Sequence, residues 1–380
     1  MSKGLSLLLI AWVMGPGSFE PFRPALPGRL IQFPQDHGVH EEFETEWWYF
    51  TGHLESADGR PFGYELTFFR RGNRAPEVLQ NPSRWSIRQL YLAHFALTDL
   101  SSKKFDYGEK ISREALGKAG AETGHLSVHI DDWRAEERDG GILLSAGENF
   151  GGIRLILRPE KPPVLHGKGG FSPKGPLPGE ASHYYSLTRL RTEGNLSDGG
   201  RDSRVKGLSW MDHEFFTSPA LTPSGGAQGP GRGEEVAGWD WFSIQLQDRL
   251  ELMFYRLRGA DGAPTPYSAG TLIYPDGSSR PLSASQVRAM PLAWWTSPRS
   301  GARYPIRWAL EIPDEGLSLV VDSLLENQEL ITRRSTRVTY WEGATRIAGR
   351  WGQRPVGGEG YLELTGYARE GTGSGVDAPR

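Results

Sequence analysis

Short segments in which apolar and polar side chains alternate recur along the whole chain, and they constrain its fold more than any other feature. The first are Glu46–Leu54, Gly63–Arg70 and Leu90–Thr98, all rich in aromatic or β-branched residues. Alternation with a period of two is typical of strands, and Asp58-Gly59 between the first two segments favours a hairpin turn. Because this pattern continues almost to the end, we expect an all-β protein made of antiparallel barrels or sandwiches.

The second half of the chain repeats the order and character of the strands in the first half. Tandem similarity of this kind predicts two related β domains. The corresponding pairs are Gly238–Leu246 with Glu46–Leu54, Leu250–Arg256 with Tyr64–Arg70, and Gly270–Tyr274 with Ala93–Leu97. Residues 222–233, rich in Gly and Pro, separate the halves. We therefore expect an N-terminal domain over 28–220, a linker over 221–234 and a C-terminal domain over 235–372.

The N-terminus has the pattern of a secretory signal peptide. Lys3 precedes a ten-residue apolar run, Leu5–Met14, which is too short to span a bilayer. We expect residues 1–17 to be this signal, although a frayed apolar terminus is the alternative. A mature chain without a transmembrane span, in the periplasm or secreted, follows from this expectation.

Composition narrows the function. The net charge is -3 and no long basic run occurs, which argues against a nucleic-acid partner. The chain has no cysteine, so disulfides, Cys-zinc sites and Cys nucleophiles are excluded. No phosphate-binding loop, dinucleotide fingerprint or zinc motif occurs, and we expect no cofactor and no metal. His37 and His40 could bind a metal only with further ligands. The 13 Trp residues indicate wide aromatic cores or an aromatic-lined pocket.

One stretch, Gly207–Phe216, places three titratable groups among aromatic side chains. If it is a strand, Asp212 and Glu214 share one face with Trp210, and His213 lies on the other. Desolvation beside aromatic rings shifts a pKa, which suits general acid–base catalysis. The structural alternative is a strand end whose acids bond the backbone or an arginine.

Several of these segments together resemble the AttH-like group of the carotenoid 1,2-hydratase (hydroxyneurosporene synthase) superfamily, also labelled predicted secreted hydrolases. The resemblance runs from about residue 28 to 370. The segments that carry it are Phe33–His40, Glu46–Tyr49, Ala93–Ala96, Tyr184–Ser186, Trp210–Glu214, Gly238–Trp241, Tyr340–Gly343 and Glu363–Tyr367. It implies two tandem lipocalin-like barrels and an extracytoplasmic bacterial protein, often encoded beside an ABC-type permease, which is a possible partner. In the hydratase branch it implies water addition to an isoprenoid double bond.

Hydrating an unactivated alkene needs a strong acid, a stabilised cation and a held water. A desolvated, protonated carboxyl group can be the acid, and aromatic faces can stabilise the cation. We expect Asp212 to be the acid, with Glu214 as second candidate. The groups expected to orient the acid or the water are His213, His183 and Tyr185. The substrate-binding candidates are Trp210, Trp239, Asp240, Trp241, Trp48 and His94.

Two other functions compete with a hydratase. The same pocket could serve a non-catalytic carrier of hydrophobic small molecules that works with a permease. A hydrolase of unknown substrate is the third alternative, but Ser186 lies outside any G-x-S-x-G elbow. Glu46 has its own structural alternative, a buried ion pair with Arg70 or Arg189.

Few helices are expected, over Ser283–Met290 and near Ala115. Residues 159–181 are expected to form a long loop that can cover a pocket.

Overall fold

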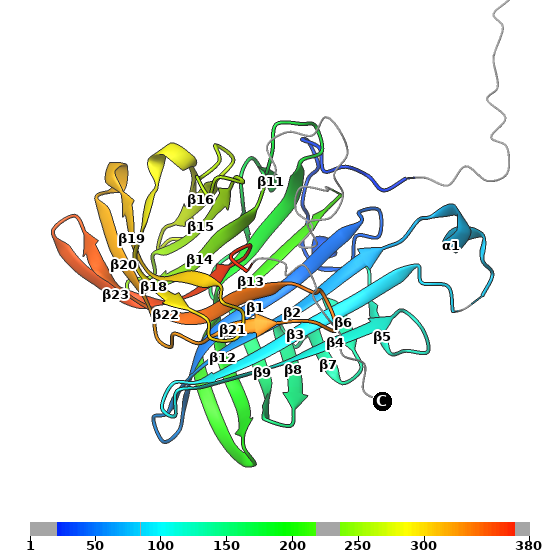
Figure 1. The fold of residues 1–380 in the computed structure, drawn as a ribbon, viewed down its shortest axis with the longest axis horizontal. Helices are drawn as coiled ribbons and strands as arrows, with labels where there is room; N and C mark the ends of the chain where they lie inside the picture. Colours follow the sequence, from blue (N-terminus) through cyan, green and yellow to red (C-terminus); the bar gives the residue numbers. More distant parts are fainter. Residues whose placement is uncertain (1–20, 84, 218–235, 369–380) are drawn as a thin grey trace, which may run out of the picture.

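The computed structural model describes residues 21–83, 85–217 and 236–368, and within them strands form most of the regular structure (Figure 1). The strands of the first half are β1 (Thr45–Ser56), β2 (Pro61–Gly72), β3 (Gln89–Asp99), β4 (Lys104–Arg113), β5 (Ala119–Ala121), β6 (Ser127–Ile130), β7 (Trp133–Arg138), β8 (Gly141–Glu148), β9 (Gly151–Pro159), β10 (Val164–Leu165), β11 (Phe171–Pro173), β12 (Ala181–Asp198) and β13 (Arg201–Phe216). Those of the second half are β14 (Gly238–Leu246), β15 (Glu251–Arg258), β16 (Ala269–Ile273), β17 (Ser279–Ser283), β18 (Arg288–Thr296), β19 (Arg303–Ile312), β20 (Leu317–Ser323), β21 (Glu329–Ile331), β22 (Thr339–Trp351) and β23 (Arg354–Leu364).

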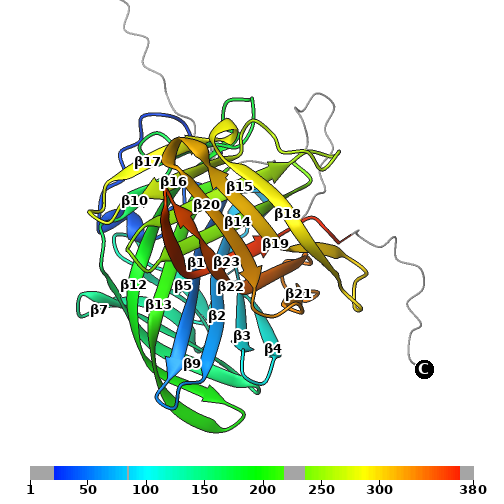
Figure 2. The ribbon, with the colours of Figure 1, turned by 90° about the vertical axis from the view of Figure 1, so that its left-hand side faces the viewer.

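Within the described residues these strands make two antiparallel sheets. The first has 13 strands in the order β4-β3-β2-β1-β13-β12-β9-β8-β7-β6-β5, with β10 and β11 paired to β12. The second has 10 strands in the order β17-β16-β15-β14-β23-β22-β20-β19-β18, with β21 paired to β22. The first sheet curls into a nearly closed barrel and the second into a half-barrel (Figure 2). The predicted all-β fold of two tandem lipocalin-like barrels is therefore confirmed.

The strand orders of the two sheets correspond element by element. In each sheet the first four strands run outward in sequence order from one side, and the last strand pairs with the first. β14, β15 and β16 thus occupy the places of β1, β2 and β3. These are the same segments whose sequences resemble one another, so the repeat is present in both sequence and topology.

Inward-facing side chains fill both barrels. On β1, Trp48 and Phe50 are buried in the core of the first barrel, whereas Trp47 and Tyr49 point out of it. On β14, Phe242 and Ile244 enter the second core and Trp241 points outward. Strand alternation produces this division, because successive side chains face opposite sides of a sheet. Aromatic residues such as Trp48 contribute about 3–5 kcal/mol each to a core of this kind.

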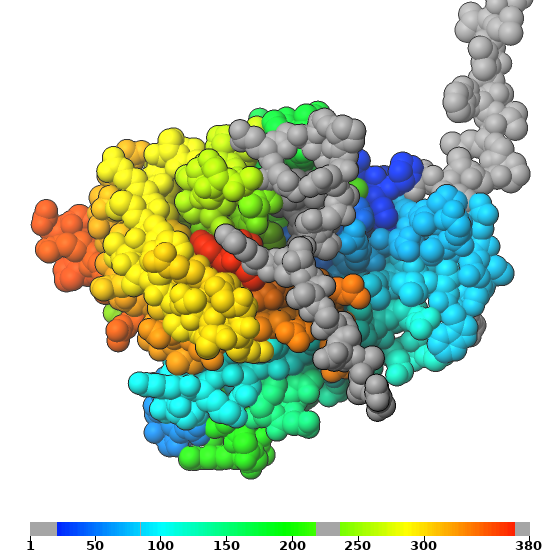
Figure 3. All heavy atoms as spheres, viewed as in Figure 1, coloured from blue at the N-terminus to red at the C-terminus, as the bar shows by residue number. Residues whose placement is uncertain are grey.

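The two barrels pack directly against each other. Strands β1, β2 and β12 of the first contact β23, β22 and β14 of the second. Glu251 lies buried in this contact and forms ion pairs with Lys161 and with Arg189, whose Nε lies 2.5 Å from Glu251 Oε1. The space-filling view shows the yellow and orange surface of the second barrel seated on the cyan and green surface of the first (Figure 3).

Four local expectations differ from the structure or lie outside it. Residues 283–290 form a 3-10 turn, η3 (Ala284–Gln286), and the start of β18, not a helix, and the chain near Ala115 is a turn. In the part of the chain that the structure describes, the other helical elements are α1 (Pro76–Gln80), η1 (Gln35–His37) and η4 (Pro313–Glu315). The expected signal peptide and the whole of the expected linker lie outside the described residues. Within those residues, no helix has the length and apolar character needed to cross a membrane.

Candidate active site between the barrels

Strand β13 presents its acidic groups to a pocket between the two barrels. Asp212 and Glu214 point outward from the first barrel, whereas Met211 and His213 point into it. The alternation predicted from sequence is confirmed here. The site is therefore an interdomain one and lies outside both barrel cores.

Aromatic side chains from both barrels are the largest group among the residues that line the pocket. Its unfilled space, including the open mouth, is about 890 Å³. The first barrel contributes Trp47, Tyr49, Thr67, Phe69, His94, Lys174, Tyr184, Asp212 and Glu214. The second barrel contributes Trp239, Trp241, Tyr255, Leu257, Thr336, Val338, Tyr340, Glu342, Glu363 and Thr365.

Asp212 is buried and held by three hydrogen-bond donors. Trp210 donates its indole N–H at 2.6 Å, the Tyr184 hydroxyl donates at 2.5 Å, and Ser186 donates through a short contact. Within the described residues Asp212 has no ion-pair partner. Burial raises the pKa of Asp212 to about 7, although the three hydrogen bonds oppose the rise. Near neutral pH this carboxyl group can therefore both donate and accept a proton.

A second layer of contacts fixes Ser186. Its hydroxyl lies 2.6 Å from Nε2 of His166, and Nδ1 of His166 lies 2.8 Å from the Thr271 hydroxyl in the second barrel. Burial lowers the pKa of His166 to about 3, so its imidazole is neutral. Because the partner behind His166 is a threonine and Ser186 is bonded to Asp212, this group lacks the carboxylate–histidine–serine order of a hydrolase triad.

Glu214 has a cation partner, unlike Asp212. Lys174 Nζ lies 3.2 Å from Glu214 Oε1, and Ser182 also bonds that oxygen. Lys174 also stands over the Tyr255 ring of the second barrel, 3.6 Å from its centre. Burial alone would lower the pKa of Lys174, but Glu214 keeps it above its ordinary value. Residues 159–181, expected to form one long loop, contain the short strands β10 and β11, and this segment brings Lys174 to the pocket.

The second barrel adds one more acidic group. Trp239 donates its indole N–H to Glu363 at 3.0 Å, and burial raises the pKa of Glu363 to about 7. Trp241, which lies opposite Glu363 in the β14–β23 register, donates to the Tyr184 hydroxyl at 3.0 Å. Through Tyr184 and Trp241, Asp212 of one barrel is therefore connected to the neighbourhood of Glu363 in the other.

Of the other residues singled out from sequence, three more lie at this site. Trp239, Trp241 and His94 line the pocket, as expected of substrate-binding groups. His94 bonds the Tyr340 hydroxyl through Nδ1 at 2.7 Å, and burial lowers its pKa to about 3. Trp210 is buried against Asp212 and acts on the acid directly.

The remaining predicted residues do not reach the pocket. His213, Tyr185 and Trp48 lie on the inner face of the first barrel, because their positions alternate with those of the pocket residues. His183 packs against Phe43 and Phe215 on that same face. The prediction that His213, His183 or Tyr185 orients Asp212 directly is therefore wrong. The side chains that hydrogen-bond to Asp212 are Tyr184, Ser186 and Trp210.

Asp240 was expected to bind substrate, but it does not line the pocket. It is buried and forms ion pairs with Arg256 at 2.9 Å and Arg258 at 3.3 Å, and the Tyr367 hydroxyl donates to it at 2.7 Å. A carboxylate compensated in this way is structural, and it does not line the pocket.

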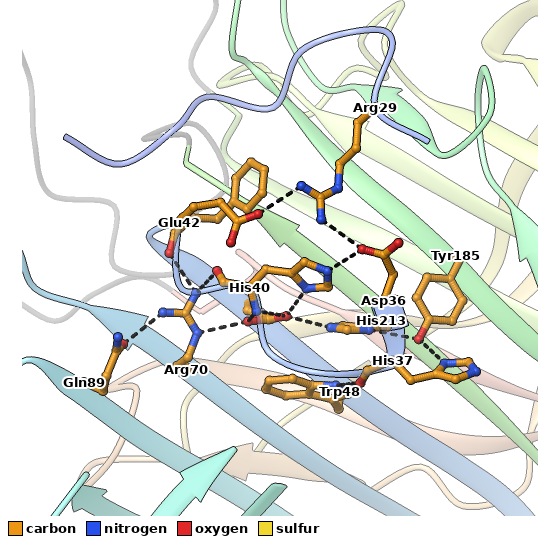
Figure 4. Close-up of polar contacts among 12 residues, drawn as sticks. Arg29, Asp36, His37, His40, Glu42, Trp48, Arg70, Gln89, Tyr185 and His213 are labelled. Atoms are coloured by element: carbon orange, nitrogen blue, oxygen red, sulfur yellow. Dashed lines mark hydrogen bonds and ion pairs between the residues drawn. The ribbon is translucent and has the colours of Figure 1, made fainter. Parts of the chain in front are cut away.

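The polar side chains that point into the first barrel form a separate network of hydrogen bonds and ion pairs at one end of that barrel (Figure 4). Glu46 Oε1 lies 2.7 Å from His40 Nδ1 and 2.8 Å from His213 Nε2, while Arg70 Nε lies 3.0 Å from the other Glu46 oxygen. The ion pair of Glu46 with Arg70, one of the two alternatives, is confirmed. Ligand atoms of His40, Glu46 and His213 lie within 4.8 Å of one another, the spacing of a group that could hold a metal. Each of these atoms already has a hydrogen-bond partner.

The site residues that sequence reasoning missed lie on strands whose pairing was unknown. Ser186 faces Asp212 and Tyr184 faces Glu214 in the β12–β13 register. In the sequence these residues stand out only as part of the motif Tyr184–Ser186. Which residues lie opposite that motif cannot be known without the strand register. Glu342 and Glu363 were visible only as parts of strand motifs.

Two antiparallel barrels with an acid-bearing aromatic pocket between them define a tandem lipocalin-like protein. The chain belongs to the AttH-like family, whose sequence model matches residues 24–367. A Nitrosomonas europaea protein whose name assigns it to AttH is 33% identical, with a TM-score of 0.78 over 91% of this chain and 100% of that one.

Two further solved structures share the fold at low identity. Kievitone hydratase from Nectria haematococca is 15% identical, with a TM-score of 0.65 over 91% of this chain and 98% of that one. CghA is 12% identical, with a TM-score of 0.52 over 93% and 97% of the two chains. No curated protein sequence matches this chain.

Proposed function

We propose that this protein is a hydratase-like acid–base enzyme that adds water to a carbon–carbon double bond of an apolar, isoprenoid or lipid-like molecule. The observation that carries the proposal is Asp212. It is buried, lacks a cation partner among the described residues, has a pKa of about 7 and lines an aromatic pocket. A shared fold with kievitone hydratase, whose name indicates water addition, is consistent with this chemistry.

In the first step Asp212 gives its proton to one carbon of the double bond. The π electrons form the new C–H bond, and the other carbon becomes a tertiary cation. Tyr184 and Trp241 line the pocket beside the acid and can face that cation with their rings. The three donors on Asp212 stabilise the carboxylate that remains, so they lower the barrier to proton loss.

In the second step the oxygen of a water molecule attacks the cation and forms the C–O bond. The oxygen then releases a proton to a carboxylate. Glu363 suits this role, because its pKa of about 7 leaves a substantial share of it ionised at neutral pH. Exchange with solvent returns a proton to Asp212, and the net change is alkene plus water to alcohol.

The alternative function uses the same pocket without turnover. A carrier of hydrophobic ligands that serves an ABC-type permease would need the aromatic walls but no particular protonation state of Asp212. Both functions are proposed for an exported protein in the periplasm or outside the cell. The apolar run near the N-terminus supports export.

The test is incubation of the full mature chain with isoprenoid and lipid extracts in ¹⁸O-labelled water, followed by mass spectrometry. Wild type should form a product heavier by one labelled water, and folded Asp212→Asn should not. Asp139→Asn is a matched control, because Asp139 lies on an exposed turn and Asn tolerates its positive φ of 51°. Retention of unchanged ligand by all three proteins would reject the hydratase and leave the carrier.

A further inference from the structure

Three glutamates lie together where the two barrels meet, and two of them, Glu342 and Glu363, line the pocket. Glu342 and Glu363 face each other directly in the β22–β23 register, and Glu65 of the first barrel is close enough to perturb Glu342 electrostatically. Within the described residues, none of the three forms an ion pair with Lys, Arg or His. Two ionised carboxylates in these opposite positions would repel each other, so ionisation of Glu342 calls for a compensating cation.

Two carboxyl oxygens in this group are buried and have no hydrogen-bond partner. They are Oε2 of Glu342 and Oε2 of Glu65. The other oxygens are occupied, since Tyr49 donates to Glu342 Oε1 at 2.5 Å and Thr67 donates to Glu65. Glu342 is 1% exposed and lines the pocket, so its free oxygen is a buried acceptor placed where a ligand would lie. Buried acceptors without a partner are rare in native proteins.

The surroundings of Glu342 are aromatic. Tyr49, Trp47, Phe69 and Tyr340 line the same pocket, and Trp239 holds the neighbouring Glu363. Aromatic faces combined with carboxylates are the usual environment of organic cations. A bare metal ion fits less well, because the ligand atoms of the three glutamates do not converge within 4.8 Å as those of His40, Glu46 and His213 do.

We propose that the pocket binds a ligand with a positively charged nitrogen, an alkylammonium group, which pairs with Glu342 while its apolar chain extends toward Asp212. Tyr49 spans the two ends, since it is the register partner of Asp212 and its hydroxyl reaches Glu342. The inference rests on the proposed ligand pocket but not on water addition. It therefore names a class of ligand that either an enzyme or a carrier would take.

The protonation state of Glu342 predicts the direction in which ligand affinity changes with pH. Burial and the neighbouring acids raise the pKa values of Glu342 and Glu65 well above the ordinary range, so both are neutral in the free protein. Binding an ammonium group at Glu342 then releases a proton, and affinity must rise with pH. The other titratable groups facing Glu342 are Glu363, Tyr49, Tyr340 and Tyr361.

The experiment titrates the full chain with n-octylammonium and with n-octanol by calorimetry at about pH 6 and about pH 8, where an alkylamine stays charged. Wild type should bind octylammonium at least about ten-fold more tightly than octanol, with a preference that grows with pH. Glu342→Gln should abolish the preference and keep octanol binding. It should fold, because Glu342 is neutral in the free protein and an amide has nearly the size and shape of a protonated carboxyl group.

Two control variants test whether the preference for the ammonium group arises at Glu342. Glu137→Gln, on the exposed side of the first barrel, should leave the preference unchanged. Asp212→Asn should also retain it, because the proposed ammonium position is at Glu342; loss of preference in Asp212→Asn alone would place the cation at the wrong end and overturn the proposal. Equal affinities of wild type for octanol and octylammonium would overturn it as well. Because these are binding measurements, a failure here is distinct from a failure of hydration.

Discussion

Tyr184 donates its hydroxyl to Asp212 Oδ2 at 2.5 Å and accepts the indole N–H of Trp241 at 3.0 Å. Asp212 and Tyr184 belong to the first barrel and Trp241 to the second. The protonation of the candidate acid is thus coupled, through one hydroxyl group, to how the barrels are docked. A change in that docking would alter the chemistry without any change in the acid itself.

Replacing Tyr184 with Phe should raise the pKa of Asp212 further. The Tyr184 hydrogen bond favours the ionised form, so its loss leaves desolvation less opposed. The measurement is a titration of the carboxyl ¹³C resonance of Asp212. Tyr185→Phe is the matched control, since this neighbour points into the barrel and bonds His213. Equal shifts in both variants would contradict the assignment of Tyr184.

The stability of the protein should depend on pH through Asp212. Its pKa rises from 3.8 to about 7 on folding, so the folded chain binds the proton more tightly than the unfolded chain. The resulting stabilisation is complete below about pH 4 and is lost as pH rises through about 7. The upper bound is about 4 kcal/mol for a shift of about three units.

Asp212→Asn removes this contribution. Compared with wild type, its free energy of unfolding should therefore depend less on pH between about 4 and 8. Urea unfolding at several pH values measures the difference. Parallel pH profiles for the two proteins would show that Asp212 is not the buried acid described here.

Alternation in Gly207–Phe216 was enough to predict that Asp212 and Glu214 share a face and that His213 lies opposite. It does not show which face borders the pocket, and the prediction that His213, His183 and Tyr185 lie beside the acid fails for this reason. Which face borders the pocket depends on the pairing of β12 with β13 and on how the two barrels pack against each other. His166 and Thr271 meet across 105 positions of sequence, and no local pattern records such a contact.

Breaking the buried ion pair inside the first barrel should be costly. Arg70 and Glu46 are both fully buried, and Arg70 also donates to the backbone oxygens of His40 and Phe43. Arg70→Met would leave Glu46 without this partner and should lower the free energy of unfolding by about 3–5 kcal/mol. Arg71→Met, which removes the exposed pair with Glu44, should cost less than about 1 kcal/mol. Chemical denaturation of the two variants makes the comparison, and similar losses would be inconsistent with a buried pair.

Close docking of the barrels depends on the absence of a side chain at Gly63. A Cβ placed there would lie 2.8 Å from Ala344 Cβ and 2.9 Å from the Tyr361 hydroxyl, both in the second barrel. Gly63→Ala should therefore push the barrels apart and lower the free energy of unfolding by about 1–3 kcal/mol. Gly120→Ala, whose nearest contact would be His129 at 3.4 Å, is the matched control.

The same variant tests the coupling between docking and chemistry. If Gly63→Ala displaces the second barrel, the Trp241–Tyr184 contact should lengthen, and the ¹³C titration of Asp212 should move away from that of wild type. The contact from Trp241 strengthens Tyr184 as a donor to Asp212 by polarising its hydroxyl, so weakening it should shift the pKa of Asp212 upward. If Gly63→Ala is destabilised but the Asp212 titration is unchanged, the pKa of Asp212 is determined by the first barrel alone.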